Sequence, residues 1–227
     1  MEVSLINNEI LINGTQGPDD IVVSLNVNMV EVSANECFET FPLPDVQRVV
    51  INAFGGGDTI RVDAPVETLI NGGFGADEIF GSSLANEIFG GPGPDRITGG
   101  PLDDMINAGR GQDTVFGLDG DDEIIGGDAS DNLNGGAGND ILMGGLGGDT
   151  LIGGDGNDML EGNVGADMLN GGNGNDELTG EGGPDNMIGG PGDDTFLGGE
   201  GFDTFNGGSG TDTALDNGEV EISIENT

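Results

Sequence analysis

The residues of this 227-residue chain whose types and spacing suit chemistry are glycines and aspartates that recur every nine positions. From residue 72 to residue 215 the unit G-G-x-G-x-D-x-U-x, where U is apolar, follows itself sixteen times without losing register, as in GGAGNDILM (135–143), GGDGNDMLE (153–161) and GGNGNDELT (171–179). Glycine permits positive φ angles and close approach of the backbone. A G-G-x-G-x turn can therefore direct several carbonyl oxygens into one small volume, and the aspartate carboxylate at position six can complete an oxygen cage.

This mixture of neutral carbonyls and carboxylates favours calcium as the bound ion. Calcium takes about six to eight oxygen ligands, many of them neutral, whereas magnesium prefers a tighter octahedron that retains water. The chain has no histidine and one cysteine, so it offers few ligands for zinc, copper or iron. We therefore predict multiple calcium ions as cofactors.

The elements that hold these turns follow from position eight, which is apolar in all sixteen copies, from Ile79 to Ala214. Positions seven to nine predict a three-residue strand whose middle side chain points inward. With one strand and one turn per copy, two copies close a coil, and eight coils stack over about 38 Å at the spacing of paired strands. The prediction is an all-β parallel solenoid rather than a globule with one central core.

The predicted core is thin, with one large side chain for every nine residues. Its hydrophobic burial is too small to offset the chain entropy of so many glycines. Metal ions that bridge successive coils must supply the remaining stability, so we expect folding and calcium binding to be one event. Without calcium we expect a disordered acidic chain.

Composition excludes several function classes. The chain has 43 acidic residues against four arginines, no lysine and a net charge of −39, so nucleic acids and anionic membrane surfaces would repel it. No apolar stretch approaches the roughly 18 residues of a membrane helix, so we expect no membrane insertion. Histidine- and lysine-dependent catalysis is absent, and the repeat explains nearly every aspartate, so we predict no enzymatic activity. We expect the single cysteine, Cys37, to be a small buried apolar residue.

Three regions differ in texture. Residues 1–52 are poor in glycine and predict an N-terminal β segment, with strands at 3–6, 10–13, 21–25, 29–33, 37–41 and 46–52. Residues 53–215 form the predicted calcium-binding roll, whose start is imperfect: Asp58 holds the aspartate position, Glu67 replaces it in the next copy, and Asn71 reads as an inserted residue. Residues 216–227 predict a C-terminal capping strand in which Val220, Ile222 and Ile224 alternate.

These repeats resemble the hemolysin-type calcium-binding repeats, or RTX repeats, of bacterial exoproteins. The resemblance covers residues 72–215 strongly and 53–71 weakly. It implies a right-handed parallel β-roll in which each calcium lies between the turns of adjacent coils, held by position-six carboxylates and turn carbonyls. Carried onto this chain, the implied metal ligands are Asp77, Asp95, Asp104, Asp113, Asp122, Asp131, Asp140, Asp149, Asp158, Asp167, Asp176, Asp185, Asp194, Asp203 and Asp212, with Gly135, Gly138, Gly144, Gly147, Gly153, Gly156, Gly171 and Gly174.

The same resemblance places the aspartates of alternate copies on the two edges of the roll. Sites between copies n and n+2 would number about fourteen, and the ions would reduce the net charge from −39 to about −11. We expect weaker sites where the pattern fails: at Asn86 with Ser82 and Leu84, at Leu102, and at Ala129.

The predicted function is calcium binding that couples folding to extracellular calcium in a secreted bacterial protein, exported by a type I secretion apparatus as the resemblance implies. The first residues lack a secretory signal, so we expect the export address elsewhere. Two alternatives stay open: a calcium-rigidified surface-binding or adhesin module for polysaccharide, cell envelope or a partner chain, and the secretion module of a larger exoenzyme. A row at position nine, from Phe80 to Asn206, is either an ordinary exposed sheet face or a docking face. Mixed residues at positions three and five argue against an ice-binding ladder.

Overall fold

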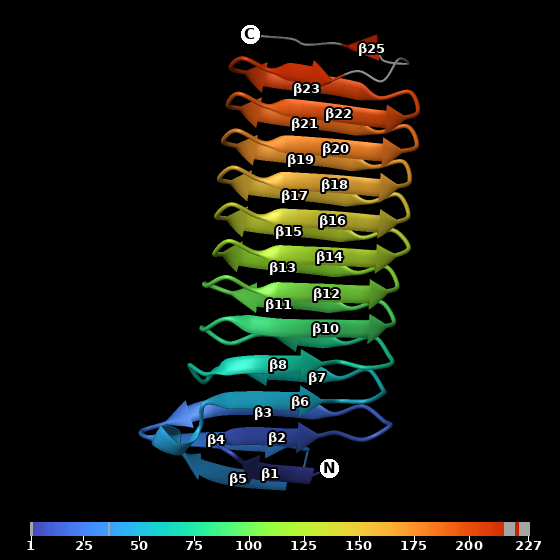
Figure 1. The fold of residues 1–227 in the computed structure, drawn as a ribbon. Coiled ribbons are helices and arrows are strands. Elements are labelled where there is room, and N and C mark those ends of the chain that lie inside the picture. Colours follow the sequence, from blue (N-terminus) through green and yellow to red (C-terminus); the bar gives the residue numbers. More distant parts are fainter. Residues whose placement is uncertain (1, 36, 216–220, 223–227) are drawn as a thin grey trace.

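The computed structural model describes residues 2–35, 37–215 and 221–222, and it shows two long β-sheets that face each other in a stack of coils (Figure 1). Sheet A has twelve strands and sheet B has thirteen. The chain passes from one sheet to the other at each turn, so consecutive strands of the roll lie in opposite sheets. Within the described residues the one helical element is a 3-10 turn, η1 (Leu43–Asp45), and no helix is long and apolar enough to cross a membrane.

The two sheets are built almost entirely from short strands of similar length. In order, sheet A consists of β1 (Glu2–Ile6), β2 (Glu9–Asn13), β6 (Arg48–Asn52), β8 (Glu67–Asn71), β10 (Asn86–Pro92), β12 (Met105–Arg110), β14 (Glu123–Asp128), β16 (Ile141–Leu146), β18 (Met159–Val164), β20 (Glu177–Gly182), β22 (Thr195–Glu200) and β24 (Thr213–Leu215). Sheet B consists of β25 (Glu221–Ile222), β23 (Thr204–Ser209), β21 (Asn186–Pro191), β19 (Met168–Asn173), β17 (Thr150–Asp155), β15 (Asn132–Ala137), β13 (Thr114–Asp119), β11 (Arg96–Gly100), β9 (Glu78–Phe80), β7 (Thr59–Val62), β3 (Asp20–Asn26), β4 (Met29–Ala34) and β5 (Cys37–Pro42).

The register of the parallel strands confirms the two-copy coil. Leu142 of β16 lies opposite Leu160 of β18, eighteen residues later, and the same offset holds through the repeats. Every position-eight side chain from Ile79 to Phe205 is buried, so the core is two facing apolar ladders, as predicted. The parallel β-solenoid expected from the sequence is confirmed.

The strands are longer than the predicted three residues. From β12 to β23 each spans six residues, because pairing continues through positions one to three of the next copy. In β16, for example, Leu142 and Gly144 both face the interior, and Gly145 and Leu146 still pair with β18. The prediction was too short because a glycine at position one is fully compatible with extended backbone.

The N-terminal region continues the solenoid. All six strands predicted in residues 1–52 are confirmed as β1 to β6. Strand β2 pairs in parallel with β6, and β6 pairs in parallel with β8 of the repeats. Strand β3 pairs in parallel with β7, so both sheets run continuously from the N-terminal region into the repeats. Antiparallel strands β1, β4 and β5 close the end of the stack (Figure 1). Cys37, expected to be buried, is partly exposed because β5 is the outermost strand of sheet B.

The irregular copy before residue 72 has a different alignment from the one expected. Thr68, not Glu67, lies opposite Asn86 at position six, and Ile70 lies opposite Ile88 at position eight. Glu67 is exposed, and Asn71 is an ordinary ninth residue. The insertion therefore lies in the turn before β8, because burial of Ile70 fixes the strand register.

The predicted C-terminal cap lies largely outside the described residues. Its described part is β25, which pairs in parallel with β23. Val220 and Ile224 are outside the described residues, and Ile222 lies in β25.

Candidate calcium centres

The position-six aspartates lie in two rows, one at each edge of the stack. We call the turns that lead into sheet A strands edge A and those that lead into sheet B strands edge B. Edge A carries Asp104, Asp122, Asp140, Asp158, Asp176, Asp194 and Asp212, and edge B carries Asp58, Asp77, Asp95, Asp113, Asp131, Asp149, Asp167, Asp185 and Asp203. All but the partly exposed Asp212 are buried. Every aspartate assigned to metal binding from the sequence therefore lies on its expected edge.

One oxygen of each carboxylate is used by the fold itself. Oδ1 of Asp95 accepts the backbone N–H of Asp77 at 2.9 Å, and Oδ1 of Asp158 accepts that of Asp140 at 2.8 Å. The same bond joins each aspartate to the position-six residue one coil earlier, at 2.7 to 3.1 Å. The aspartates thus connect successive coils before any ion is considered.

The second oxygen of each carboxylate is buried and has no hydrogen-bond partner. This holds for Oδ2 of all sixteen position-six aspartates from Asp58 to Asp212. A buried carboxylate oxygen without a partner is strongly unfavourable, since removal from water is not compensated. A cation beside these atoms would compensate the cost, so the residues present fit calcium.

The copy that begins at Gly81 shows how a hydrogen-bond donor satisfies the oxygens of one such turn. Here position six is Asn86, and its Nδ2 donates to the carbonyl of Leu84 at 2.8 Å and to that of Ser82 at 3.3 Å. The same nitrogen donates to Oδ1 of Asp104 in the next coil at 2.8 Å. An aspartate at this place would set an oxygen beside the same carbonyl oxygens, and such a group of oxygens is what a cation stabilises.

A sequence model of the RTX calcium-binding nonapeptide repeat matches residues 69–88, 80–115, 116–151, 143–178, 152–187 and 179–214, which together cover more than half of the chain. The chain belongs to this RTX family. A comparison with curated proteins finds no match. The RTX repeats of this chain bind calcium, and the aspartate rows are the part of the structure suited to do so.

The RTX glycines divide into two roles. The position-four glycines Gly138, Gly147, Gly156 and Gly174 have φ between +132° and +150°, and a Cβ there would overlap the position-four carbonyl oxygen of the coil below. The position-one glycines Gly135, Gly144, Gly153 and Gly171 have a different neighbour, because a Cβ there would strike Oδ2 of the aspartate in the same copy. Position four therefore lets carbonyls stack along the axis, and position one leaves room for the carboxylate.

Position two has a steric requirement like that of position four, although it was not among the sequence-assigned residues. Its residue has positive φ in most copies, including the non-glycines Phe54, Leu118, Asn163 and Glu181. A Cβ at Gly145 would overlap the carbonyl oxygen of Gly127 in the coil below. The signal was present, since position two is glycine in most copies.

Carboxylates alone do not form these RTX sites. Within the described part of the chain, no group of three or more acidic, histidine or cysteine side chains gathers in a metal-binding cluster. The ligand set must therefore rely on backbone carbonyls, which calcium accepts more readily than most biological cations.

Burial makes the metal-free RTX carboxylates hard to ionise. It raises the pKa of Asp122 to about 8 and that of Asp95 and Asp131 to about 7, although backbone hydrogen bonds lower each pKa in part. Neighbouring carboxylates of the same edge raise the pKa further. The same burial and like charge mean that the ionised carboxylates need a bound cation to offset their charge.

The three turns expected to be weak differ from one another. Ser82 and Gly100 lack the positive φ usual at position two, and Leu84 and Leu102 lack it at position four. Ala129 instead keeps the left-handed conformation, with φ of 88°. The first two turns thus depart from the RTX geometry, whereas the third keeps it at the cost of strain.

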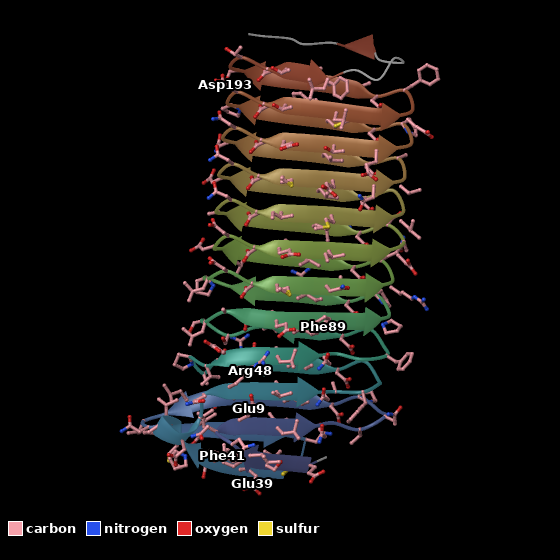
Figure 2. All side chains as sticks on the ribbon, viewed as in Figure 1. Glu9, Glu39, Phe41, Arg48, Phe89 and Asp193 are labelled. Atoms are coloured by element: carbon pink, nitrogen blue, oxygen red, sulfur yellow. The ribbon has the colours of Figure 1, made fainter. Side chains whose placement is uncertain are left out.

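A second polar row lies beside the aspartates on edge A. Position five there is occupied by Asp103, Asp121, Asn139, Asn157, Asn175, Asp193 and Thr211. Backbone N–H groups of this row donate to Oδ1 of the same position one coil earlier, as Asn157 does to Asn139 at 3.0 Å. Figure 2 shows the exposed edge, with Asp193 labelled. The row cannot be recognised in the sequence while the copies of both edges are pooled, because position five on edge B is mixed.

Proposed function

We propose that this RTX chain is a calcium-folded module of a secreted bacterial protein, whose regular repeats stay loose where calcium is scarce and fold outside the cell. The series of sixteen buried Oδ2 atoms without partners carries this proposal. At intracellular calcium levels these carboxylates repel one another in a low-dielectric interior, which opposes closure of the coils. An open chain of this kind suits export through a type I secretion apparatus.

The number of ions follows from the intervals between consecutive aspartates. Edge B has eight intervals, from Asp58 to Asp203, and edge A has six, from Asp104 to Asp212. The total of about fourteen ions equals the number inferred from the sequence. The set of sites differs, because the Asp58–Asp77 interval replaces the Asn86–Asp104 interval. We expect affinities of roughly 10⁻⁴ to 10⁻³ M, typical of extracellular calcium modules.

Circular dichroism during a calcium titration tests the proposal. The metal-free chain at neutral pH should have little β signal beyond its N-terminal coils, and calcium should produce the rest cooperatively. Asp149→Ala, in the middle of edge B, should reduce both the cooperativity and the bound calcium. Asp119→Ala removes the same charge from an exposed position and should change neither. A complete β signal in excess chelator at neutral pH would refute calcium-dependent folding.

A second candidate function is a surface-binding module, and the outward face of sheet A favours it. Phe89, Met105, Ile141 and Met159 are between 37% and 51% exposed on strands β10 to β18. Glu87, Glu123 and Glu177 lie on the same face, so the occupant would be a basic amphipathic segment of a partner protein. Met105→Ser with Met159→Ser should abolish such binding without changing calcium affinity. We propose no catalytic activity for either function.

A further inference from the structure

The turn at residues 81–86 does not fit a cation. The three acceptors that would surround an ion, the carbonyls of Ser82 and Leu84 and Oδ1 of Asp104, already receive hydrogen bonds from Nδ2 of Asn86. A calcium ion there would meet two N–H groups in place of a carboxylate oxygen. The amide thus fills the site that an ion fills elsewhere.

The remaining polar groups of this turn are also satisfied without metal. Oδ1 of Asn86 accepts the backbone N–H of Ser82 at 2.8 Å and the hydroxyl of Thr68 at 2.6 Å. The hydroxyl of Ser82 donates to the carbonyl of Val66 at 2.6 Å. These bonds connect the turn to the coil below it, as the aspartate–amide bonds do in the regular copies.

Below Asn86 the position-six places of edge A hold no carboxylate. Register places Thr68, Val49 and Ile10 there in successive coils. At the start of edge B, Asp19 is the position-six residue of an additional copy at residues 14–22, and its carboxylate accepts hydrogen bonds from Thr15 N at 2.6 Å and Asn35 Nδ2 at 2.7 Å. Of the sixteen unpartnered Oδ2 atoms, two belong to this part of the stack, those of Asp58 and Asp77.

The first coils also bury more apolar surface than the later ones. The regular copies place glycine and aspartate beside one large apolar residue per strand. In β2 and β6 the interior holds Ile10 with Ile12 and Val49 with Ile51, and β7 holds Ile60 with Val62. Each additional buried Val or Ile adds hydrophobic stabilisation that needs no ion. The first coils therefore depend less on bridging ions.

Charge density also differs between the coils up to β10 and those that follow. Residues 1–92 contain 14 acidic residues and two arginines, whereas residues 93–227 contain 29 acidic residues and two arginines, both of them before residue 111. Arg48 of β6 bridges to Glu87 of β10 at 2.8 Å, across the intervening strand β8. An amide ladder joins β2, β6 and β8: Nδ2 of Asn52 donates to Oδ1 of Asn13 at 3.1 Å, and Nδ2 of Asn71 donates to Oδ1 of Asn52 at 2.9 Å. Self-repulsion is thus weakest where the hydrogen bonding needs no metal.

We propose that the coils from β1 to β10, which we call the N-terminal seed, fold without calcium and template the calcium-dependent coils that follow. The proposal rests on calcium-dependent folding of the later repeats. A preformed last strand, β10, provides an open sheet edge, so each new coil closes against an ordered neighbour. Folding then proceeds from β10 toward β24 as calcium binds.

Hydrogen–deuterium exchange with mass spectrometry on the full chain tests the seed. In chelator at neutral pH, amides of residues 48–71 should exchange at least about tenfold more slowly than those of residues 123–155. Calcium should then slow the second group to the level of the first. Equal, fast exchange of both groups in chelator, with protection of both in calcium, would overturn the seed and leave calcium-dependent folding intact. Slow exchange of both residue groups in chelator would overturn the seed and the calcium-dependent folding of the later repeats.

A single substitution tests the role of the Asn86 side-chain amide. Asn86→Asp places a carboxylate oxygen where the Asn86 amide nitrogen now lies. Amides of residues 48–71 should then exchange faster in chelator and become protected again in calcium. Asn107→Asp makes the same change on the outer face of sheet A and should leave the exchange of residues 48–71 unchanged. Undiminished protection in the Asn86 variant would refute the role of the amide. The wild-type comparison decides the seed even if this variant fails to fold in calcium.

Discussion

Asp104→Asn should stabilise the fold at low calcium concentration and destabilise it at high calcium concentration. The turn of Asp104 resembles that of Asn86, because neither has positive φ at positions two and four. The new amide should donate to the carbonyls of Gly100 and Leu102, as Asn86 does to its own turn. Two such hydrogen bonds contribute about 2 kcal/mol. The interval below Asp104 is already filled by Asn86, so the variant loses the single ion shared with Asp122.

The calcium dependence of the lost ion sets the crossover. An ion contributes about 0.4 kcal/mol when calcium equals its Kd and about 2.7 kcal/mol at 100 times its Kd. Asp104→Asn should therefore be more stable than wild type by about 1.6 kcal/mol at the lower concentration and less stable by about 0.7 kcal/mol at the higher. The two stabilities should cross near 30 times the Kd, roughly where the ion contributes 2 kcal/mol.

Urea unfolding followed by circular dichroism at several calcium concentrations measures this crossover. Asp103→Asn is the matched control, since it removes the same charge from the adjacent exposed residue. Its effect should be small and should keep one sign at all calcium concentrations. If Asp104→Asn were destabilising at every calcium concentration, or indistinguishable from the control, the idea that an amide substitutes for the ion would be wrong.

Three further predictions concern backbone and protons. Ala129→Gly should stabilise the calcium-bound fold by about 1 kcal/mol in urea unfolding, because φ of 88° suits glycine, whereas Ala137→Gly should not stabilise it. Gly156→Ala should weaken closure of its coil and raise the calcium concentration needed for folding, because a Cβ would overlap a carbonyl of the coil below. Gly182→Ala should be tolerated because its nearest neighbour is 3.7 Å away; equal circular dichroism titrations of the two variants would contradict this. Burial raises the pKa of Asp122 to about 8 from its ordinary 3.8, so the folded state binds this proton more tightly than the unfolded state. Metal-free stability should therefore be highest below about pH 4 and fall as pH rises toward 8, and a β signal that grows with pH in metal-free buffer would refute the shift.

The sequence was sufficient for the parts of the fold that repeat. One apolar residue at position eight and one aspartate at position six determined the coil, the two edges and the buried ladders from Ile79 to Phe205. The same pattern failed at Glu67 because spacing alone placed it at position six. In the structure the burial of Ile70 decides the register, and the inserted residue is accommodated in a turn.

Other features could not be predicted from the sequence because a coil contains two copies, so each repeat position has two structural environments. Position five looks mixed over all copies, yet on edge A it is a row from Asp103 to Thr211, and on edge B it is not. The copy at residues 14–22 escaped for a different reason. Thr15 replaces the second glycine, and a long antiparallel excursion separates Asp19 from Asp58, its partner in the edge.

The aspartates show why fold and calcium site are inseparable in this chain. Oδ1 makes the inter-coil bond, and Asn86 and Thr68 show that uncharged side chains can supply the equivalent bonds. The fold therefore does not need a charge at position six, and at Val49 and Ile10 it has no polar side chain there at all. What the carboxylate adds is Oδ2, an atom that no donor in the protein satisfies. The charge thus contributes nothing to closure of a coil until a cation arrives, and it opposes closure before then. Aspartate in place of asparagine at fifteen of the sixteen regular copies is what makes folding conditional on calcium.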